Sequence, residues 1–305
     1  MNNELWPELP LAEWEPTRAT LHMWTQIVGK IRLARTPMVN HWWNVPLYVT
    51  ARGLTTGAMP CDRRTFSIDF DFVDHQLVVA CSDGAIVRAA LEPMTVARFH
   101  GLVFELLEGL GIRVEIWPVP VEVPDPIPFK EDAVHAEYDR DAVTRFWRAL
   151  VQVDRVFAIF RSRFGGKCSP VHFFWGSFDL AVTRFSGRPA LPRPDADFIT
   201  RHSYNAELSS LGFWPGGGDV DGAAFYSYTF PEPHGFRSER VRPDAGRFHE
   251  GLGLFLLMYD DVRAANDPDA MILEFAQSTY EAGALLQHWP IEQLEVRGVA
   301  EGATT

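Results

Sequence analysis

Apolar residues recur three and four positions apart in several stretches, which is the pattern of a helix with one buried face. Proline or glycine follows most of these stretches, as expected where helices stop. Residues 1–16, rich in proline and tryptophan, are expected to be extended. The spacing predicts helices from Thr17 to Pro37, from Thr95 to Gly111, from Asp139 to Gly165, and from Asn266 or Asp267 to Leu285.

Other stretches alternate apolar and polar residues, which is the pattern of a strand with one buried face. Turn residues such as those at 82–84 separate these stretches. The alternation predicts strands over residues 45–52, 65–73, 76–81, 85–91, 112–117, 207–214, 223–230 and 252–259, and one that starts at Phe178.

The order of the elements repeats once along the chain. Each half has a helix, a loop, a histidine followed by two aromatic residues, a strand that ends in arginine, and a closing helix. His41 precedes Arg52 by eleven residues, and His172 precedes Arg184 by twelve. This order predicts an internal duplication of a helix–strands–helix unit.

A run of five prolines over residues 118–128 excludes a helix or a central strand there. We therefore expect a first α+β half over residues 1–117, a proline-rich linker over 118–130 and a second α+β half over 131–305. The predicted fold class is α+β, with antiparallel-rich sheets and helices packed on one side.

Polar chemistry is concentrated in the nineteen residues from Pro170 to Arg188, which also hold five aromatic rings. On a regular strand Asp179 and Arg184 lie on opposite faces, so a bulge would be needed to bring them together. The plain alternative is that the rings are core, Asp179 caps a turn and Arg184 pairs with a surface carboxylate.

We expect His172 to border a solvent-connected pocket and to shuttle protons, because an imidazole titrates near neutral pH. In this hypothesis Asp179 orients His172, and Arg184 holds an anionic group of the ligand. A duplication would place His41 at the position equivalent to His172, with both beside the boundary between the halves, where pockets often form. The expected ligand-binding residues are His41, Trp42, Trp43, Phe174, Trp175, Glu207 and Tyr226.

His22, Gln26 and Lys30 lie four residues apart, on the face next to the apolar face of the first helix. This row could look into a cleft, but a solvated helix face is the more frequent explanation. The chain has no short-spaced set of histidines and cysteines, so no metal site is expected. A site built from His172, His202, Glu207 and perhaps Asp179 is the alternative. It has neither a nucleophile elbow nor a dinucleotide fingerprint, and it points to no particular cofactor.

Composition narrows the classes of partner. Aromatic residues make up 13% of the chain, which favours a ring-lined pocket or extensive aromatic packing. The formal net charge of −12 argues against a nucleic-acid partner, since such partners need a basic surface. A small molecule is the expected partner, and a homo-oligomer is compatible with the sequence.

Three cysteines without C-x-x-C spacing, Cys61, Cys81 and Cys168, are typical of a protein in a reducing cytoplasm. The first residues lack the basic and apolar regions of a signal peptide. No apolar run reaches the length of about 18 residues that a membrane helix needs. We therefore expect a cytoplasmic location and no membrane partner.

Three functions stay open at this stage. The first is an enzyme that acts on a small polar or aromatic molecule by acid–base chemistry centred on His172. The second is a non-catalytic module that binds a small molecule. The third is a structural or partner-binding protein whose rings are simply core. A bell-shaped pH profile, saturable binding without turnover, and the absence of any pocket would distinguish them.

Four strings of the sequence resemble a bacterial family of unknown function, domain of unknown function 5996. The resemblance covers nearly the whole chain and implies a soluble bacterial protein, but it brings no activity, cofactor or catalytic residue. The strings are Trp6-Pro7-x-Leu9-Pro10, Thr20-Leu21-His22-Met23-Trp24-Thr25-Gln26-Ile27-Val28-Gly29-Lys30, Asn40-His41-Trp42-Trp43, and the twelve residues from Ser169 to Leu180.

Overall fold

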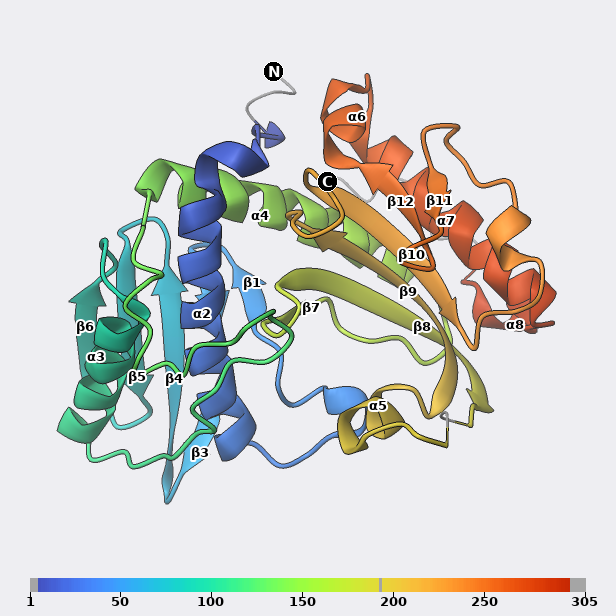
Figure 1. Ribbon diagram of the computed structural model, residues 1–305. Helices are drawn as coiled ribbons and strands as arrows, with labels where there is room; N and C mark the ends of the chain where they lie inside the picture. The colour runs from blue at the N-terminus through green and yellow to red at the C-terminus, as the bar shows by residue number, and fades with distance from the viewer. Residues whose placement is uncertain (1–4, 192–193, 297–305) are drawn as a thin grey trace, which may run out of the picture. The chain divides into compact units, whose positions relative to one another are not determined.

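The computed structural model describes residues 5–191 and 194–296, and it confirms the α+β class with two antiparallel sheets (Figure 1). The chain forms two compact units. The first comprises residues 1–152, 172–179 and 217–221, and the second comprises 153–171, 180–216 and 222–305. The units therefore do not divide at the proline-rich segment 118–130, which belongs to the first unit.

The sheet of the first unit has the order β1-β2-β4-β5-β6, with β3 paired to β4. Phe66, Ile68 and Phe70 are buried on one face of β4, as the alternation predicts. Residues 112–117 form no strand, because Ile112 N–H donates to Leu107 at the end of the preceding helix and no strand pairs with the segment. The strands are β1 (Tyr48–Thr50), β2 (Gly53–Thr55), β3 (Met59–Cys61), β4 (Arg64–Asp71), β5 (Gln76–Cys81) and β6 (Ile86–Ala90).

Two helices, α2 (Leu11–Arg35) and α3 (Val96–Gly109), cover one face of this sheet (Figure 1). Trp24 of α2 stacks on Phe99 of α3 at 4.5 Å between ring centres. The helix α2 begins earlier than predicted, because Trp14 buries its first turns against Phe146. Every residue of α2 from Thr20 to Arg32 is buried. The row His22, Gln26 and Lys30 is therefore not a solvated face.

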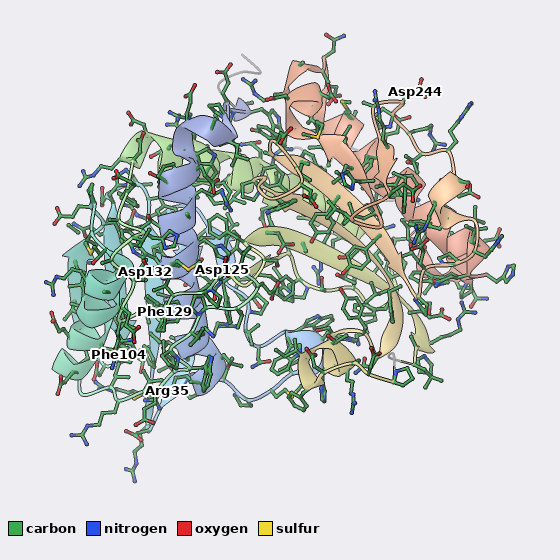
Figure 2. All side chains as sticks on the ribbon, in the orientation of Figure 1. Arg35, Phe104, Asp125, Phe129, Asp132 and Asp244 are labelled. Atoms are coloured by element: carbon green, nitrogen blue, oxygen red, sulfur yellow. The ribbon has the colours of Figure 1, made fainter. Side chains whose placement is uncertain are left out.

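The proline-rich segment is held against the helices of the first unit. Gln26 Nε2 donates to the Val121 carbonyl and Val121 N–H donates to Gln26 Oε1, each at 2.8 Å. Further along, Phe129 is fully buried and Asp132 accepts a backbone hydrogen bond from Ala97 at the start of α3. Figure 2 shows Phe129 and Asp132 beside α3. These bonds hold residues 118–132 against the helices of the first unit.

The helix α4 (Arg140–Ser162) starts in the first unit and ends in the second. The strands of the second unit are ordered β11-β12-β10-β9-β8, and α7 (Pro268–Leu286) packs on β9 and β10. Shorter helices are α5 (Phe198–Ser203), α6 (Tyr259–Ala264) and α8 (Ile291–Leu294). The strands are β8 (Asp179–Pro189), β9 (Ala206–Trp214), β10 (Ala224–Phe230), β11 (Arg247–His249) and β12 (Leu254–Met258).

The strand β7 (His172–Phe174) belongs to the first unit, as does the short 3-10 turn η1 (Asn40–Trp42). Leu47 and Phe173 exchange two backbone hydrogen bonds of 2.9 Å each. Both units combine helices with an antiparallel sheet, but this likeness does not establish a common origin, and the duplication stays a prediction. None of the helices in the described part of the chain is long and apolar enough to span a membrane.

Gln26→Leu is expected to release the proline-rich segment from α2. Leucine fills a similar volume but leaves Val121 N–H and C=O without their partner, at a cost of about 1–3 kcal/mol. Urea unfolding should show this loss, and amide exchange of residues 119–123 should accelerate. The matched control is Gln293→Leu at an exposed position, which should change stability by less than about 0.5 kcal/mol. Unchanged exchange over 119–123 in the Gln26→Leu protein would contradict the anchoring role.

Candidate functional site

The turn after β7 is fixed to α2 through Trp175. A Cβ atom placed on Gly29 would overlap the Trp175 ring, so the indole lies directly on the helix backbone. Trp175 Nε1 donates to the Val45 carbonyl at 2.9 Å, and only 6% of the residue is exposed. Trp175, which we expected to bind a ligand, therefore anchors residues 172–179 to the helix.

The next residue of this turn, Gly176, is held by His22. His22 Nε2 lies 2.8 Å from the Gly176 carbonyl. Because a carbonyl only accepts, Nε2 carries the proton and donates it. Burial lowers the pKa of His22 to about 4, so the imidazole is neutral at pH 7. His22 therefore positions the turn as an uncharged donor.

Two carboxyl groups meet at the same turn. A Cβ on Gly176 would lie 2.5 Å from Glu122 Oε1, so the Glu122 carboxyl rests on this glycine. Asp179 is buried and accepts a hydrogen bond from Ser177 Oγ. Glu122 is an exposed residue, but burial of its carboxyl, followed by the charge of Asp179, raises the pKa of Glu122. The two carboxyl groups therefore interact, and the charge of Asp179 makes ionisation of Glu122 less favourable.

Left-handed backbone occurs at both segments that carry this pair. Glu122 has a φ of 57° and Phe178 a φ of 59°. His41 and Trp42 in η1 have φ values of 60° and 58°. Each such conformation costs a non-glycine residue about 1–2 kcal/mol. Strain of this kind tends to gather at binding and catalytic sites, where the surrounding structure maintains it.

His172 is enclosed by rings of the first unit. Its ring centre lies 5.9 Å from Trp43, 5.7 Å from Tyr48 and 5.4 Å from Phe174. The three surrounding rings are partly exposed, whereas His172 itself is 1% exposed. The solvent-connected pocket expected at His172 stays a prediction.

The other predicted residues of η1 lie beside this ring cluster. His41 is buried, its ring centre is 5.8 Å from that of Trp43, and its Nε2 is 3.3 Å from Asn40 Nδ2. Trp42 is partly exposed. His41, Trp43 and His172 thus belong to one continuous set of rings.

Lys30 is the third member of the polar row on α2. It is 5% exposed, and its Nζ lies 5.8 Å from the centre of the Trp175 ring. Burial alone lowers the pKa of Lys30 to about 8. In the part of the chain that the structure describes, no side chain forms an ion pair or a hydrogen bond with this ammonium.

Arg184 is a core residue of the second unit, not a partner in a surface ion pair. Its guanidinium carbon lies 3.5 Å from the centre of the Phe160 ring and 4.6 Å from that of Tyr280. It donates to the Phe160 carbonyl and, at 3.4 Å, to Gln277 Oε1. Burial lowers the pKa of Arg184 to about 10, and the residue has no exposed surface. These contacts explain Arg184 without a ligand.

Glu207 and Tyr226 also belong to the second unit. Glu207 Oε2 accepts from Ser186 Oγ at 2.8 Å and pairs with the Arg188 guanidinium at 2.7 Å. The Tyr226 ring covers Gly212 on the neighbouring strand. Both residues, predicted as ligand-binding, therefore have structural contacts of their own.

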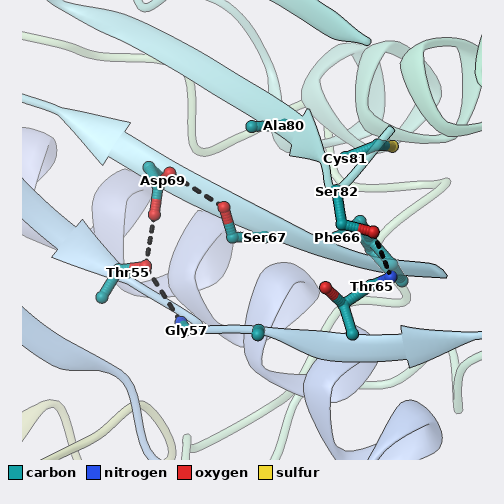
Figure 3. Close-up of a pocket in the computed structure, with 10 residues that line it drawn as sticks. Thr55, Gly57, Thr65, Phe66, Ser67, Asp69, Ala80, Cys81 and Ser82 are labelled. Atoms are coloured by element: carbon teal, nitrogen blue, oxygen red, sulfur yellow. Dashed lines mark hydrogen bonds between the residues drawn. The ribbon is translucent and has the colours of Figure 1, made fainter. Parts of the chain in front are cut away.

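A hollow of about 370 Å³ lies on the sheet of the first unit and contains none of the predicted site residues (Figure 3). Asp69 accepts from Thr55 Oγ1 and, at 3.1 Å, from Ser67 Oγ, and Thr55 in turn accepts from Gly57 N–H at 2.9 Å (Figure 3). The polar side chains of Thr55, Ser67 and Asp69 therefore bond within the hollow.

The sequence pattern did not single out Glu122. For Lys30 it allowed a cleft but favoured a solvated helix face. Glu122 lies in a segment expected to be a linker, and its contact at Gly176 joins positions far apart in the chain. Over residues 5–191 and 194–296, no group of three His, Cys, Asp or Glu side chains could hold a metal ion.

Comparison with known proteins identifies the family. A family described as one of unknown function (DUF5996) matches residues 6–296. The chain belongs to this family. The match includes every residue of the site in the first unit. No curated protein and no solved structure matches the chain.

Gly29→Ala is expected to displace Trp175 and destabilise the protein by about 1–3 kcal/mol, because the added methyl group overlaps the indole ring. The control is Gly109→Ala in α3, where a Cβ would meet no atom within 4 Å. This control should be neutral or slightly stabilising, since alanine has the higher helix propensity. Chemical denaturation measures both, and equal effects of the two substitutions would contradict the close packing.

Lys30→Met is expected to stabilise the protein at pH 7 by up to about 3 kcal/mol, since each pKa unit corresponds to about 1.4 kcal/mol. The pKa of Lys30 is lowered from 10.5 to about 8 on folding, so the unfolded chain binds the extra proton between these values. The penalty is complete below pH 8 and disappears as the pH rises to 10.5. Thermal unfolding of both proteins from pH 7 to 10.5 should show a difference that shrinks with pH. A stability difference between the two proteins that stays constant over this pH range would contradict a lowered pKa of Lys30.

Proposed function

We propose that the protein is an enzyme that acts on a small polar or aromatic molecule by acid–base chemistry, with Glu122 and Asp179 as its proton-transferring pair. The observation that supports this proposal is the carboxyl of Glu122, whose pKa is raised by burial and by the charge of Asp179. Two carboxyl groups whose environments separate their pKa values are a common acid–base arrangement.

In this proposal Glu122, whose pKa is raised, acts as the general acid. Asp179, which accepts a hydrogen bond from Ser177, acts as the general base. The turn that carries Asp179 is positioned by two contacts with α2. His22 bonds to the Gly176 carbonyl, and the Trp175 ring packs on the backbone of Gly29. The strained backbone of Glu122 is consistent with a residue held in place for function.

His172 keeps its proposed role as a proton shuttle, seven residues before Asp179 in the same turn-bearing segment. Trp43, Tyr48 and Phe174 surround it and would form the apolar wall for a substrate ring. These three rings are partly exposed, so they could contact a ligand without unfolding of the core.

The carboxyl pair can be tested without a substrate. In wild-type protein, ¹³C carboxyl titration should give Glu122 a pKa above its ordinary value of 4.5. Asp179→Asn should bring that pKa down, because the repelling charge is gone. An unaltered Glu122 pKa in the Asp179→Asn protein would show that the two carboxyls do not interact.

Turnover is tested with a mixture of small polar and aromatic metabolites, followed by mass spectrometry. Glu122→Gln and Asp179→Asn should each slow the consumption of the substrate by about 100-fold or more, given the usual size of acid–base contributions. Asp125→Asn, at an exposed position of the same segment, is the matched control and should keep full activity. Equal turnover in all four proteins would rule out the proposed roles.

A non-catalytic binding module is the second candidate, and the partly exposed rings around His172 favour it. Such a module would bind a ligand saturably and leave it chemically unchanged. Binding that survives in the Glu122→Gln protein, with no turnover in wild type, would support this alternative.

A further inference from the structure

The three polar residues on the buried side of α2 differ in how their polar groups are used. His22 donates to the Gly176 carbonyl, and Gln26 forms two hydrogen bonds with the Val121 backbone. Lys30 follows at the same helical spacing and is also buried; its ammonium lies over the Trp175 ring, and among the described residues it forms no ion pair or hydrogen bond with a side chain. The hydrogen bonds of His22 and Gln26 compensate for the burial of their polar groups. No such bond compensates for the burial of Lys30.

An ammonium on a largely buried side chain is unfavourable, because the charge loses part of its hydration and gains no counter-ion. The ring of Trp175 offers a cation–π attraction of about 0.5–2 kcal/mol, which only partly offsets that loss. An apolar residue of similar length would avoid the cost entirely. A charge at this position therefore suggests a role in which the charge meets a partner from outside the chain.

We propose that Lys30 binds the carboxylate group of a small ligand in the first unit. Trp175 is fixed by Gly29 and by its hydrogen bond to Val45, so the ammonium lies against a rigid wall. A carboxylate at Lys30 would supply the missing counter-charge and accept charge-assisted hydrogen bonds.

The number of nearby cations favours a single negative charge over a phosphate. Phosphate sites generally use a bidentate arginine or a helix N-terminus. Lys30 lies near the C-terminal end of α2, far from its N-terminus. The nearest arginine along the helix, Arg32, lies over the Tyr48 ring at 5.4 Å. The single positive charge of Lys30 therefore fits a ligand group with one negative charge, such as a carboxylate.

Lys30 takes over the anion-holding role that the sequence suggested for Arg184. The guanidinium of Arg184 is used by Phe160, Gln277 and Tyr280 in the second unit. The inference rests on the proposed function only in locating the ligand in the first unit, and it requires no turnover.

The test is calorimetric titration of the full-length protein with acetate and benzoate, each paired with its neutral amide, acetamide or benzamide. Wild type should bind at least one carboxylate saturably and about tenfold or more tightly than the matching amide. Lys30→Met and Lys30→Gln should each lose about tenfold or more of that affinity while circular dichroism shows a folded protein. The chain has three lysines, and Lys167→Met serves as the control that should bind like wild type.

Three results would overturn the inference: no saturable carboxylate binding up to about 10 mM, equal binding of acid and amide, or unchanged binding in both Lys30 variants. Each of these leaves the acid–base proposal standing, since the carboxyl titration and the turnover comparison depend on Glu122 and Asp179. Conversely, carboxylate binding that needs Lys30 would hold even if Glu122→Gln left turnover unchanged.

Discussion

The first unit depends on one constraint, which is that α2 is buried on every side from Thr20 to Arg32. A helix with an apolar stripe needs cover on one face only, and its polar residues normally meet water. Here the polar residues are enclosed as well, so each must find a partner or destabilise the fold. The segments around 121 and 176 meet the helix at two such residues, Gln26 and His22.

This constraint explains how the carboxyl pair is brought together. Gln26 holds the residue next to Glu122, and His22 holds a residue three positions before Asp179. Two segments that are far apart in the sequence are thereby fixed on one helix, with the Glu122 carboxyl at Gly176 and within the influence of the Asp179 charge. The bonds that complete the core also position the groups to which we assign chemistry. Lys30 is buried on the same helix, but no hydrogen bond to a described side chain compensates for its burial.

The elements set by local sequence were largely predictable. The alternation of β4 and the periodicity of α3 and α4 appear in the structure close to the expected bounds. Residues 112–117 have the composition of a strand but find no partner, which a local pattern does not reveal. The aromatic residues around His172 and Asp179 in the sequence were enough to mark both as candidate site residues. Glu122 could not be identified from the sequence, because its role depends on a contact with Gly176. The burial of Lys30 could not be predicted either, because it depends on cover from distant segments.

The Trp175 ring on Gly29 joins a helix near the start of the chain to a turn synthesised much later. Until residues 172–179 have left the ribosome, the hydrophobic and polar surface of α2 around Gly29 lacks its cover. Such contacts between distant positions slow folding, because a long loop must close before they form. The first unit is also discontinuous in sequence, so no cut near the proline-rich segment yields a fragment that contains all of it. A shortened clone ending there would expose α2 to aggregation, and the protein is best produced as the entire chain.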